Sequence, residues 1–431
     1  MVLGGGDLTE ETVRALEASG AEVSHLEEPT GDDVRAALDG GPVESVAVVG
    51  RTDAIVVRRA LMVRSVSTEV PLLLTIFDPN MAAQTRERLE NTRVTSLADI
   101  VAPSLAGPCI DERFTAVSEG HRHPIALIED YGEVREEPIP KQRARRPEAL
   151  ARALLTPYDK SAGLLLFGAI GLVAVFLIET VTAVFVLDDS VVDAVYGSAK
   201  TLVTVDPNPA VKDGPDWYKV FTSTTMVVAL VFAASFTAGL VNRVIDRRLT
   251  GLAGRRAVPR RDHVVVIGLG QVGLRLCLLL RACGIPVVAV EQEEETETVG
   301  LAREYGLPVV VGRGADVSVM RRLSLGRAKA VAAVTSDDLS NISAAMTARG
   351  VHEEVRVVLR VGDGEVANET RSLLALGIVR DVHRIAAALL VRMALGDGAE
   401  TVVCLGDDAH VRFSDGRLER AELDTLAGPD G

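Results

Sequence analysis

The chain has 431 residues, enough for about three domain-sized units, and 46 Lys and Arg against 60 Asp and Glu give a net charge of −14. This acidic balance, with only 3% aromatic residues, argues against nucleic-acid binding, which needs clustered basic or stacking side chains. The four cysteines form no C-x-x-C pair and have no histidine at ligand spacing, which excludes a disulfide framework and disfavours a metal site. The mean hydropathy is nevertheless positive, which indicates that very apolar segments coexist with ordinary soluble ones.

Residues 1–135 alternate short apolar strands with helices, which predicts a Rossmann-like α/β domain. The first residues lack the basic-then-apolar pattern of a signal peptide. The turn Gly4-Gly-Gly-Asp7 follows the first strand but is not a complete G-x-G-x-x-G, and no acid stands out at the end of the second strand. This domain looks like a diverged copy of the strand–helix plan that recurs in the carboxy-terminal domain. The interpretation we favour is an assembly domain without a ligand of its own. We expect strands at 1–3, 21–24, 45–49 and 70–77 and helices at 7–18 and 53–64.

Residues 136–160 form a charged linker that is expected to lead into a helix on the membrane surface. The ranges 161–187 and 220–243 are then almost entirely apolar, and about 20 such residues cross the hydrocarbon core. Lys and Arg gather before the first range and in the basic linker 246–261 after the second, and such residues stay in the cytoplasm. We therefore predict two membrane-spanning helices in the inner cell membrane, with both termini cytoplasmic. Glu179 lies near the outer end of the first span, where we expect its side chain to reach the interface; a functional role, as is usual for an acid deeper in the membrane, is the alternative.

The connection between the two apolar ranges has the plan of a pore module: span, short helix, loop and span. Residues 191–209 form the expected re-entrant pore loop, and irregular backbone at membrane depth must line a cavity or be buried in protein. The second span places Ser235, Gly239 and Asn242 on one helical face. This face either lines a pore, with Gly239 as a hinge, or packs against another helix through its small residues.

Residues 262–395 carry the strongest motif, a dinucleotide-binding fingerprint between a β-branched strand and a helix. In this pattern the first glycine allows a tight turn, the second lets the backbone approach a pyrophosphate, and the third packs the helix on the strand. The acid at the end of the second strand suits a ribose 2′-hydroxyl. Asp337 and Asp338 follow a later strand and serve equally well as helix caps or as ligand contacts. The fingerprint consists of Gly268, Gly270, Gln271, Val272, Gly273 and Glu291.

No second domain that would bind a hydride acceptor is evident. We therefore expect this domain to bind a nucleotide without catalysing a reaction, so that the protein is not an enzyme. Residues 396–431 are either a shortened lobe or a tail.

With these elements in place, residues 150–395 resemble a two-span potassium channel with a cytosolic RCK (regulator of potassium conductance) domain. The stretches 71–77 and 93–103 resemble a subgroup of NAD-binding, TrkA-like membrane proteins with a second Rossmann-like domain before the pore module. The resemblance implies a homotetramer in membrane lipid, potassium or another monovalent cation as the permeant ion, and NAD or NADH as ligand. Relatives often have Asp where this chain has Arg313, which offers phosphate contacts or a salt bridge. ADP, ATP and a cyclic dinucleotide therefore stay open as alternative ligands.

The filter is the largest departure from the family pattern T-V-G-Y-G-D. Only Thr204 and Val205 match, and Asp206, Pro207 and Asn208 replace the following Gly-Tyr-Gly. Three outcomes stay open: an Asp206 ring that passes other cations, a closed pore, or a different loop that conducts potassium. The corresponding functions are a nucleotide-regulated cation channel or transport subunit and a non-conducting, membrane-anchored sensor or scaffold. A membrane-tethered, NAD-dependent oxidoreductase is a further alternative.

Overall fold

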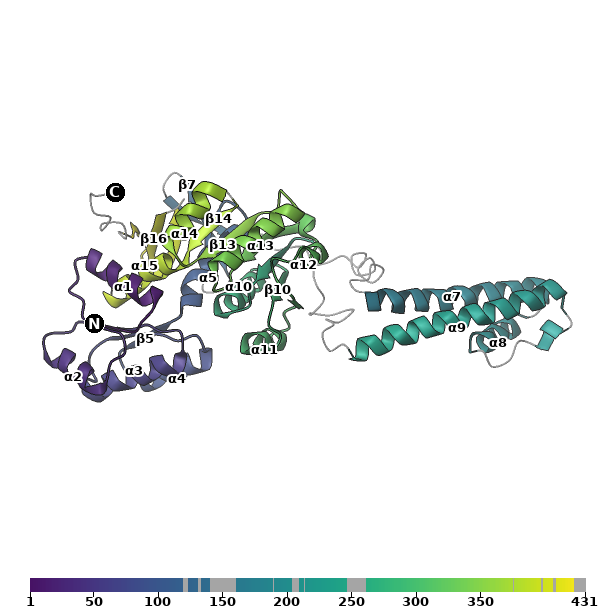
Figure 1. The fold of residues 1–431 in the computed structure, drawn as a ribbon, viewed down its shortest axis with the longest axis horizontal. Coiled ribbons are helices and arrows are strands. Elements are labelled where there is room, and N and C mark those ends of the chain that lie inside the picture. The colour runs from purple at the N-terminus through teal and green to yellow at the C-terminus, as the bar shows by residue number, and fades with distance from the viewer. Residues whose placement is uncertain are drawn as a thin grey trace. The chain divides into compact units, whose positions relative to one another are not determined.

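The computed structural model describes residues 1–118, 123–130, 133–139, 160–188, 190–203, 209–212, 214–245, 261–374, 376–396, 398–405 and 408–421. The chain divides into two compact units (Figure 1). An α/β unit combines Met1–Gln142 with Val258–Gly431, and a helical unit comprises Arg143–Ala257.

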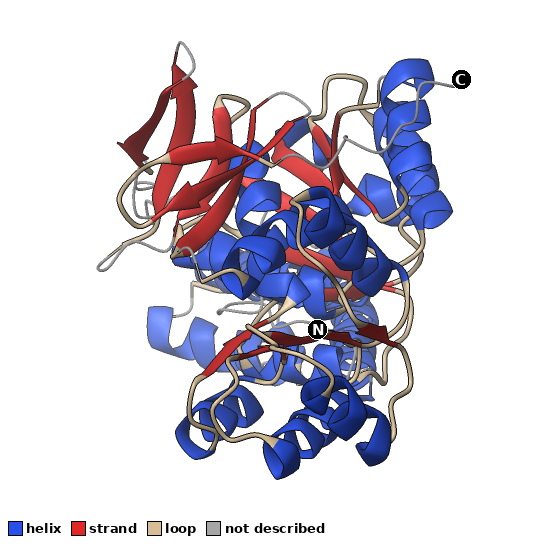
Figure 2. Cartoon of the chain, turned by 90° about the vertical axis from the view of Figure 1, so that its left-hand side faces the viewer, coloured by secondary structure: helices blue, strands red, loops and turns tan. Residues whose placement is uncertain are grey.

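The first half of the α/β unit contains a five-stranded parallel sheet in the order β2-β1-β3-β4-β5, with helices on both faces (Figure 2). Its second strand begins at His25 and not within 21–24, because Ala21 N still bonds Leu16 O (3.1 Å) at the end of the preceding helix. The strands are β1 (Val2–Leu3), β2 (His25–Leu26), β3 (Val46–Val48), β4 (Leu72–Thr75) and β5 (Thr92–Thr95). The helices are α1 (Asp7–Ala18), α2 (Gly31–Asp39), α3 (Asp53–Val66), α4 (Pro79–Arg88) and α5 (Leu97–Ile110).

The second half contains a six-stranded parallel sheet in the order β11-β10-β9-β12-β13-β14, which is the strand order of a Rossmann fold. The strands are β9 (His263–Ile267), β10 (Val287–Glu291), β11 (Val309–Val311), β12 (Ala328–Ala333), β13 (Val357–Val361) and β14 (Ile378–Asp381). The helices are α10 (Gln271–Ala282), α11 (Glu297–Glu304), α12 (Val317–Arg322), α13 (Asp338–Val351), α14 (Gly364–Glu369) and α15 (Val382–Ala394).

Each Rossmann-like domain is followed by a three-stranded antiparallel meander. The first runs three residues beyond position 135, where we placed the domain boundary. The second occupies part of 396–431, so the described part of that region is a small lobe and not a tail. The strands are β6 (Phe114–Ser118), β7 (Ile125–Asp130) and β8 (Glu133–Pro138), and then β15 (Ala399–Leu405), β16 (Asp408–Phe413) and β17 (Leu418–Arg420).

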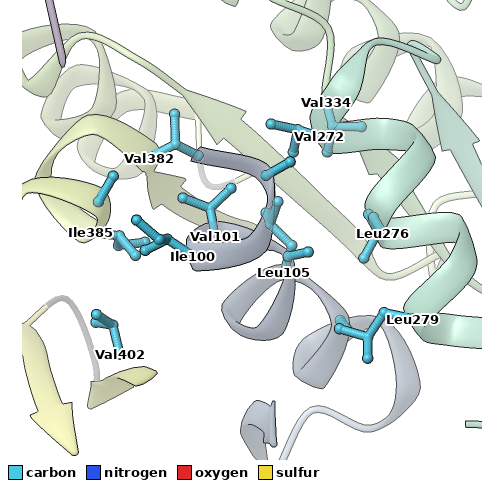
Figure 3. Close-up of a cluster of buried hydrophobic side chains, with 14 of the residues drawn as sticks. Ile100, Val101, Leu105, Val272, Leu276, Leu279, Val334, Val382, Ile385 and Val402 are labelled. Carbon is cyan, nitrogen blue, oxygen red and sulfur yellow. The ribbon is translucent and has the colours of Figure 1, made fainter. Parts of the chain in front are cut away.

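A shared hydrophobic core joins the two Rossmann-like domains. Helix α1 packs against α15, and α5 packs against α10. The pairing is reciprocal, because α1 and α10 follow the first strand of their sheets while α5 and α15 follow the last. Figure 3 shows Val101 and Leu105 of α5 among side chains of α10 and α15. Leu105 is completely buried, so the two domains bury apolar surface together and are expected to fold as one unit.

The helical unit consists of a long antiparallel pair, α7 (Lys160–Val186) and α9 (Asp216–Ile245), with α8 (Val191–Leu202) packed on both. A short 3-10 helix, Pro209–Lys212, precedes α9. Within the pair, Leu164–Val186 and Asp216–Val241 are long and apolar enough to cross a membrane. Many of their large apolar side chains are exposed on this chain, which is unlike the core helix of a soluble protein.

Glycines bring α7 and α9 close together. A Cβ on Gly239 would lie 2.6 Å from Leu165 N, and a Cβ on Gly168 would lie 2.5 Å from Phe236 N. Glu179 is buried and accepts a hydrogen bond from the Thr225 hydroxyl of α9. Our expectation that this side chain reaches the interface is therefore wrong: a neighbouring hydroxyl satisfies the carboxyl group inside the helix pair.

Candidate functional site

The turn from β9 into α10 has the geometry that its three glycines predict. Gly268 adopts φ +91°, and its N–H donates to Val290 O (2.9 Å) on the neighbouring strand. A Cβ on Gly273 would lie 1.9 Å from Gly268 O, so the third glycine lets the helix close on the turn. Gly270 is different, because no atom lies within 4 Å of the place its Cβ would occupy. The middle glycine therefore leaves space in front of the helix N-terminus, where backbone N–H groups favour an anion.

Glu291 ends β10 beside this turn. Its carboxylate accepts hydrogen bonds from Leu269 N (2.6 Å) and Gln292 N (2.7 Å). These contacts hold the side chain next to the Gly268–Gly270 backbone, where an acid can accept hydrogen bonds from ribose hydroxyls. The sequence prediction that Glu291 belongs with the glycine-rich turn agrees with this placement.

The carboxyl ends of β12 and β13 are joined by two polar side chains. Asn341 is buried, accepts from Thr335 N (2.8 Å) and donates to Arg360 O (2.9 Å). Asp338 accepts from the N–H groups of Gly362 (3.0 Å) and Asp363 (3.2 Å). Both side chains are therefore used to fix the loops at this edge of the sheet.

These loops line a cleft of about 1140 Å³ between the carboxyl edges of the two sheets. One side is formed by the Gly268–Val272 turn, Glu291 and the ends of β12, β13 and β14; the other is formed by Gly5–Leu8 and the ends of β3, β4 and β5. This volume accommodates a nucleotide. The cleft is lined mostly by polar atoms, so a ligand would be recognised through hydrogen bonds and charge.

Asp381, at the end of β14, is a polar cleft residue that we did not predict from the sequence. Its carboxylate caps α15 by accepting from Arg384 N (3.0 Å). Burial nevertheless raises the pKa of Asp381 to about 6. The pKa of the nearby His383 is lowered, also chiefly because the ring is buried.

The amino-terminal domain contains several of the same structural features. Gly4 N donates to Leu26 O (3.0 Å), as Gly268 N does to Val290 O, and the next residue on that strand is Glu27. Glu27 therefore stands at the position of Glu291, although we predicted no matching acid from the sequence. Its strand contains only two residues, which left no pattern by which to align it.

A second feature common to both domains is a carboxylate that accepts hydrogen bonds from two backbone N–H groups of a neighbouring loop. Asp53 accepts from Phe77 N (3.0 Å) and Asp78 N (2.8 Å), as Asp338 does from Gly362 and Asp363. The two domains thus share their loop construction. The amino-terminal turn differs in its acidic first helical turn, with Asp7 and Glu10, which disfavours a phosphate there.

The remaining predicted site residues lie in several places. Arg313 and Asp337 are not among the residues lining the cleft, and Asp337 caps α13 by accepting from Ser340 N (2.9 Å). The pKa of Asp337 is lowered by its hydrogen bonds to Ser340. Gly239 faces α7, and the Ser235 hydroxyl donates to Val231 O in its own helix. The backbone of Asn242 is helical, while the filter positions Thr204, Val205, Asp206, Pro207 and Asn208 lie outside the described residues.

Comparison with known proteins identifies relatives for much of the chain. Residues 264–381 match the TrkA-N domain family. The voltage-gated potassium channel Kch of Escherichia coli (strain K12) is 24% identical over 248 residues, which cover 56% of this chain and 58% of Kch. The Trk system potassium uptake protein TrkA of Streptomyces coelicolor is 36% identical over 138 residues, which cover 32% of this chain and 60% of that protein. The matches thus span less than two-thirds of either relative.

A solved structure also supports the fold. The GsuK channel aligns with a TM-score of 0.51 at 14% identity, covering 94% of this chain and 66% of that one. Residues 264–381 therefore match a TrkA-N domain, and parts of the chain are homologous to a potassium channel and to potassium uptake proteins.

Proposed function

We propose that this chain is a subunit of a nucleotide-regulated, potassium-type cation channel or transport assembly. In this proposal α7, α8 and α9 form the membrane-embedded pore module of a homotetramer, with the loop after α8 re-entering the membrane. Both termini and the whole α/β unit lie in the cytoplasm. The chain binds its nucleotide without catalysing a reaction, and binding shifts the pore equilibrium because the open and closed states differ in affinity for the ligand.

The observation that carries this proposal is the turn from β9 to α10. The open space at Gly270, the N-terminus of α10 and the fixed carboxylate of Glu291 together suit an adenosine ribose and a pyrophosphate. An acid in this place would repel a 2′-phosphate, which favours NAD or NADH over NADP. ADP and ATP contain the same adenosine and pyrophosphate groups and fit the same features.

The helical unit supports the proposal of a membrane-embedded pore module. Two apolar helices of sufficient length flank a shorter helix, and the homology to Kch supports potassium as the permeant ion. The segment Thr204-Val205-Asp206-Pro207-Asn208 lacks the Gly-Tyr-Gly of the family filter, which favours a second candidate function, a non-conducting membrane-anchored nucleotide sensor. Replacing three residues together, Asp206→Gly, Pro207→Tyr and Asn208→Gly, distinguishes the two. Potassium flux that appears only in this variant supports the sensor and shows that the remaining pore module is competent.

Two measurements on purified full-length protein test the proposal directly. Native mass spectrometry in detergent is expected to give the mass of a tetramer, and isothermal titration calorimetry is expected to detect binding of NADH, ADP or ATP. A monomer that binds none of these nucleotides contradicts the proposal.

A further inference from the structure

In the described part of the chain, Arg360 is a cleft cation without an ion-pair partner. It lies near the end of β13, and only part of its side chain is exposed. Among the residues that the structure describes, no carboxylate forms an ion pair with it, and its Nε is buried without a hydrogen bond. The carboxylate that most favours its charge is Asp338, which already accepts hydrogen bonds from two backbone N–H groups. A guanidinium that has lost water without gaining a partner is stabilised by any anion that reaches it.

A second cation approaches Arg360 from the amino-terminal domain. Arg51 follows β3 and lines the same cleft. Burial is the main reason that the pKa of Arg360 is lowered, and the positive charge of Arg51 lowers it further. The only ion pair that Arg51 forms with a described residue is a long contact, 3.4 Å, to the exposed Asp7. Two like charges from different domains therefore line the same cleft, an arrangement that an anion bound between them would stabilise.

The two cations are absent from the matching positions of the repeat. Because Asp53 matches Asp338 and Phe77 matches Gly362, Arg360 corresponds to Thr75, and Arg51 corresponds to Ser336. Each domain thus supplies an arginine where the other has a hydroxyl. The cationic pair is a property of the assembled cleft and not of the Rossmann-like plan that both domains share.

The position of Arg360 relative to the nucleotide site indicates which group it meets. In this fold the ligand runs from the acid after the second strand, over the glycine-rich turn, to the strand ends on the other side of the switch point. Glu291 and Gly270 account for the ribose and the pyrophosphate. Arg360 belongs to β13, on the far side of that turn, so a group that reaches it lies beyond the pyrophosphate.

We infer that Arg360 and Arg51 form an anion-binding subsite, built by both domains, for the terminal phosphate of a nucleoside triphosphate. The inference rests on the nucleotide site proposed above and specifies its ligand class. A triphosphate would bridge the two domains, whereas a diphosphate would leave the pair of arginines unoccupied. The terminal phosphate is thus the group that discriminates between the two ligands, because guanidinium groups bind phosphate strongly.

Calorimetry of the full-length protein with ATP, ADP and NADH tests this assignment. Arg360→Met and Arg51→Met remove each charge while keeping a long side chain. Arg58→Met, on the exposed side of α3 and away from this cleft, is the matched control. We expect wild-type protein to bind ATP about tenfold more tightly than ADP, and each cleft variant to lose about this factor for ATP while ADP binding stays within about twofold. The control is expected to match wild type.

The outcomes separate this inference from the proposed function. One outcome is that the nucleotides bind and Gly270→Ala weakens their binding, but both cleft variants keep the wild-type preference between ATP and ADP. In that case the assignment of the subsite is wrong and the assignment of the nucleotide site stands. Binding of NADH without ATP also overturns the subsite. If wild-type protein binds no nucleotide, the proposed function and the subsite both fail. Circular dichroism melting of each variant verifies that the compared proteins are folded.

Discussion

Alanine substitutions at four glycines are expected to separate nucleotide binding from folding. Gly268, Gly270 and Gly273 belong to the turn before α10, and Gly300 lies exposed in α11 as the control. The same added methyl group meets a different environment at each position. The series therefore tests which glycines the fold requires and which one the ligand requires.

The expected magnitudes follow from the contacts of the added Cβ. At Gly273 it would lie 1.9 Å from Gly268 O, which we expect to cost more than about 3 kcal/mol of unfolding free energy. At Gly268 it would lie 2.6 Å from the Thr335 methyl group, at a φ that costs a further ~1–2 kcal/mol for alanine. At Gly270 and Gly300 it meets no atom within 4 Å. Gly270→Ala is therefore expected to leave stability unchanged, and Gly300→Ala to raise it by up to about 1 kcal/mol.

Binding should be affected differently. A methyl carbon keeps a phosphate oxygen roughly 3.5–4.0 Å away, whereas a backbone N–H bonds it at about 2.7–3.2 Å. Losing one hydrogen bond to a charged group costs about 1.5–3 kcal/mol, so Gly270→Ala should weaken nucleotide binding at least about tenfold. Thermal melting and calorimetry on the same samples give both quantities. Wild-type affinity in a folded Gly270→Ala variant would refute the assignment of the turn.

Three further predictions concern other parts of the structure. The pKa of Asp381 is raised to about 6, above its ordinary value of 3.8, so the native state binds this proton more tightly than the unfolded state. Its contribution to stability therefore falls as the pH rises from about 4 to 6. Asp381→Asn, which keeps an N-cap, is expected to be more stable than wild type above pH 7 by up to about 3 kcal/mol; a melting-temperature difference that is the same from pH 4 to 8 contradicts this. Leu105→Ala removes a fully buried side chain between the two Rossmann-like domains and should cost about 2–5 kcal/mol. Hydrogen exchange should show both domains losing protection together, and protection lost from one domain alone would refute a shared core. Gly239→Ala places a Cβ 2.6 Å from Leu165 N and should lower the melting temperature of the helical unit in detergent; an unchanged melt would indicate that α7 and α9 do not pack closely there.

The sequence predicted the glycine-rich turn and its acid because these features depend on local rules. A strand, three glycines at fixed spacing and a helix define the backbone path around Gly268, whatever surrounds it. The two apolar helices were predictable for the same reason, since length and hydropathy suffice.

The cleft was not predictable, because residues far apart in the sequence form it. Arg51 and Arg360 are brought together only by the reciprocal packing of α1 on α15 and of α5 on α10. Helix α5 is apolar on nearly every side, which indicates burial but does not identify the partner. Glu27 was not predicted, because a strand of two residues is too short to show a hydrophobic period. Its correspondence to Glu291 follows from the register of β2 on β1 and of β10 on β9.

Cation flux into proteoliposomes tests the central claim most directly. Purified tetramer is reconstituted, and potassium, sodium and calcium uptake are measured separately, with and without NADH, ADP and ATP. We predict potassium flux above that of empty liposomes, and we expect this flux to change when nucleotide is added. Gly270→Ala should abolish the response to nucleotide, and Gly300→Ala should retain it. Absence of flux for every ion and nucleotide, from tetramer shown to bind nucleotide, would contradict a channel and leave a membrane-anchored sensor.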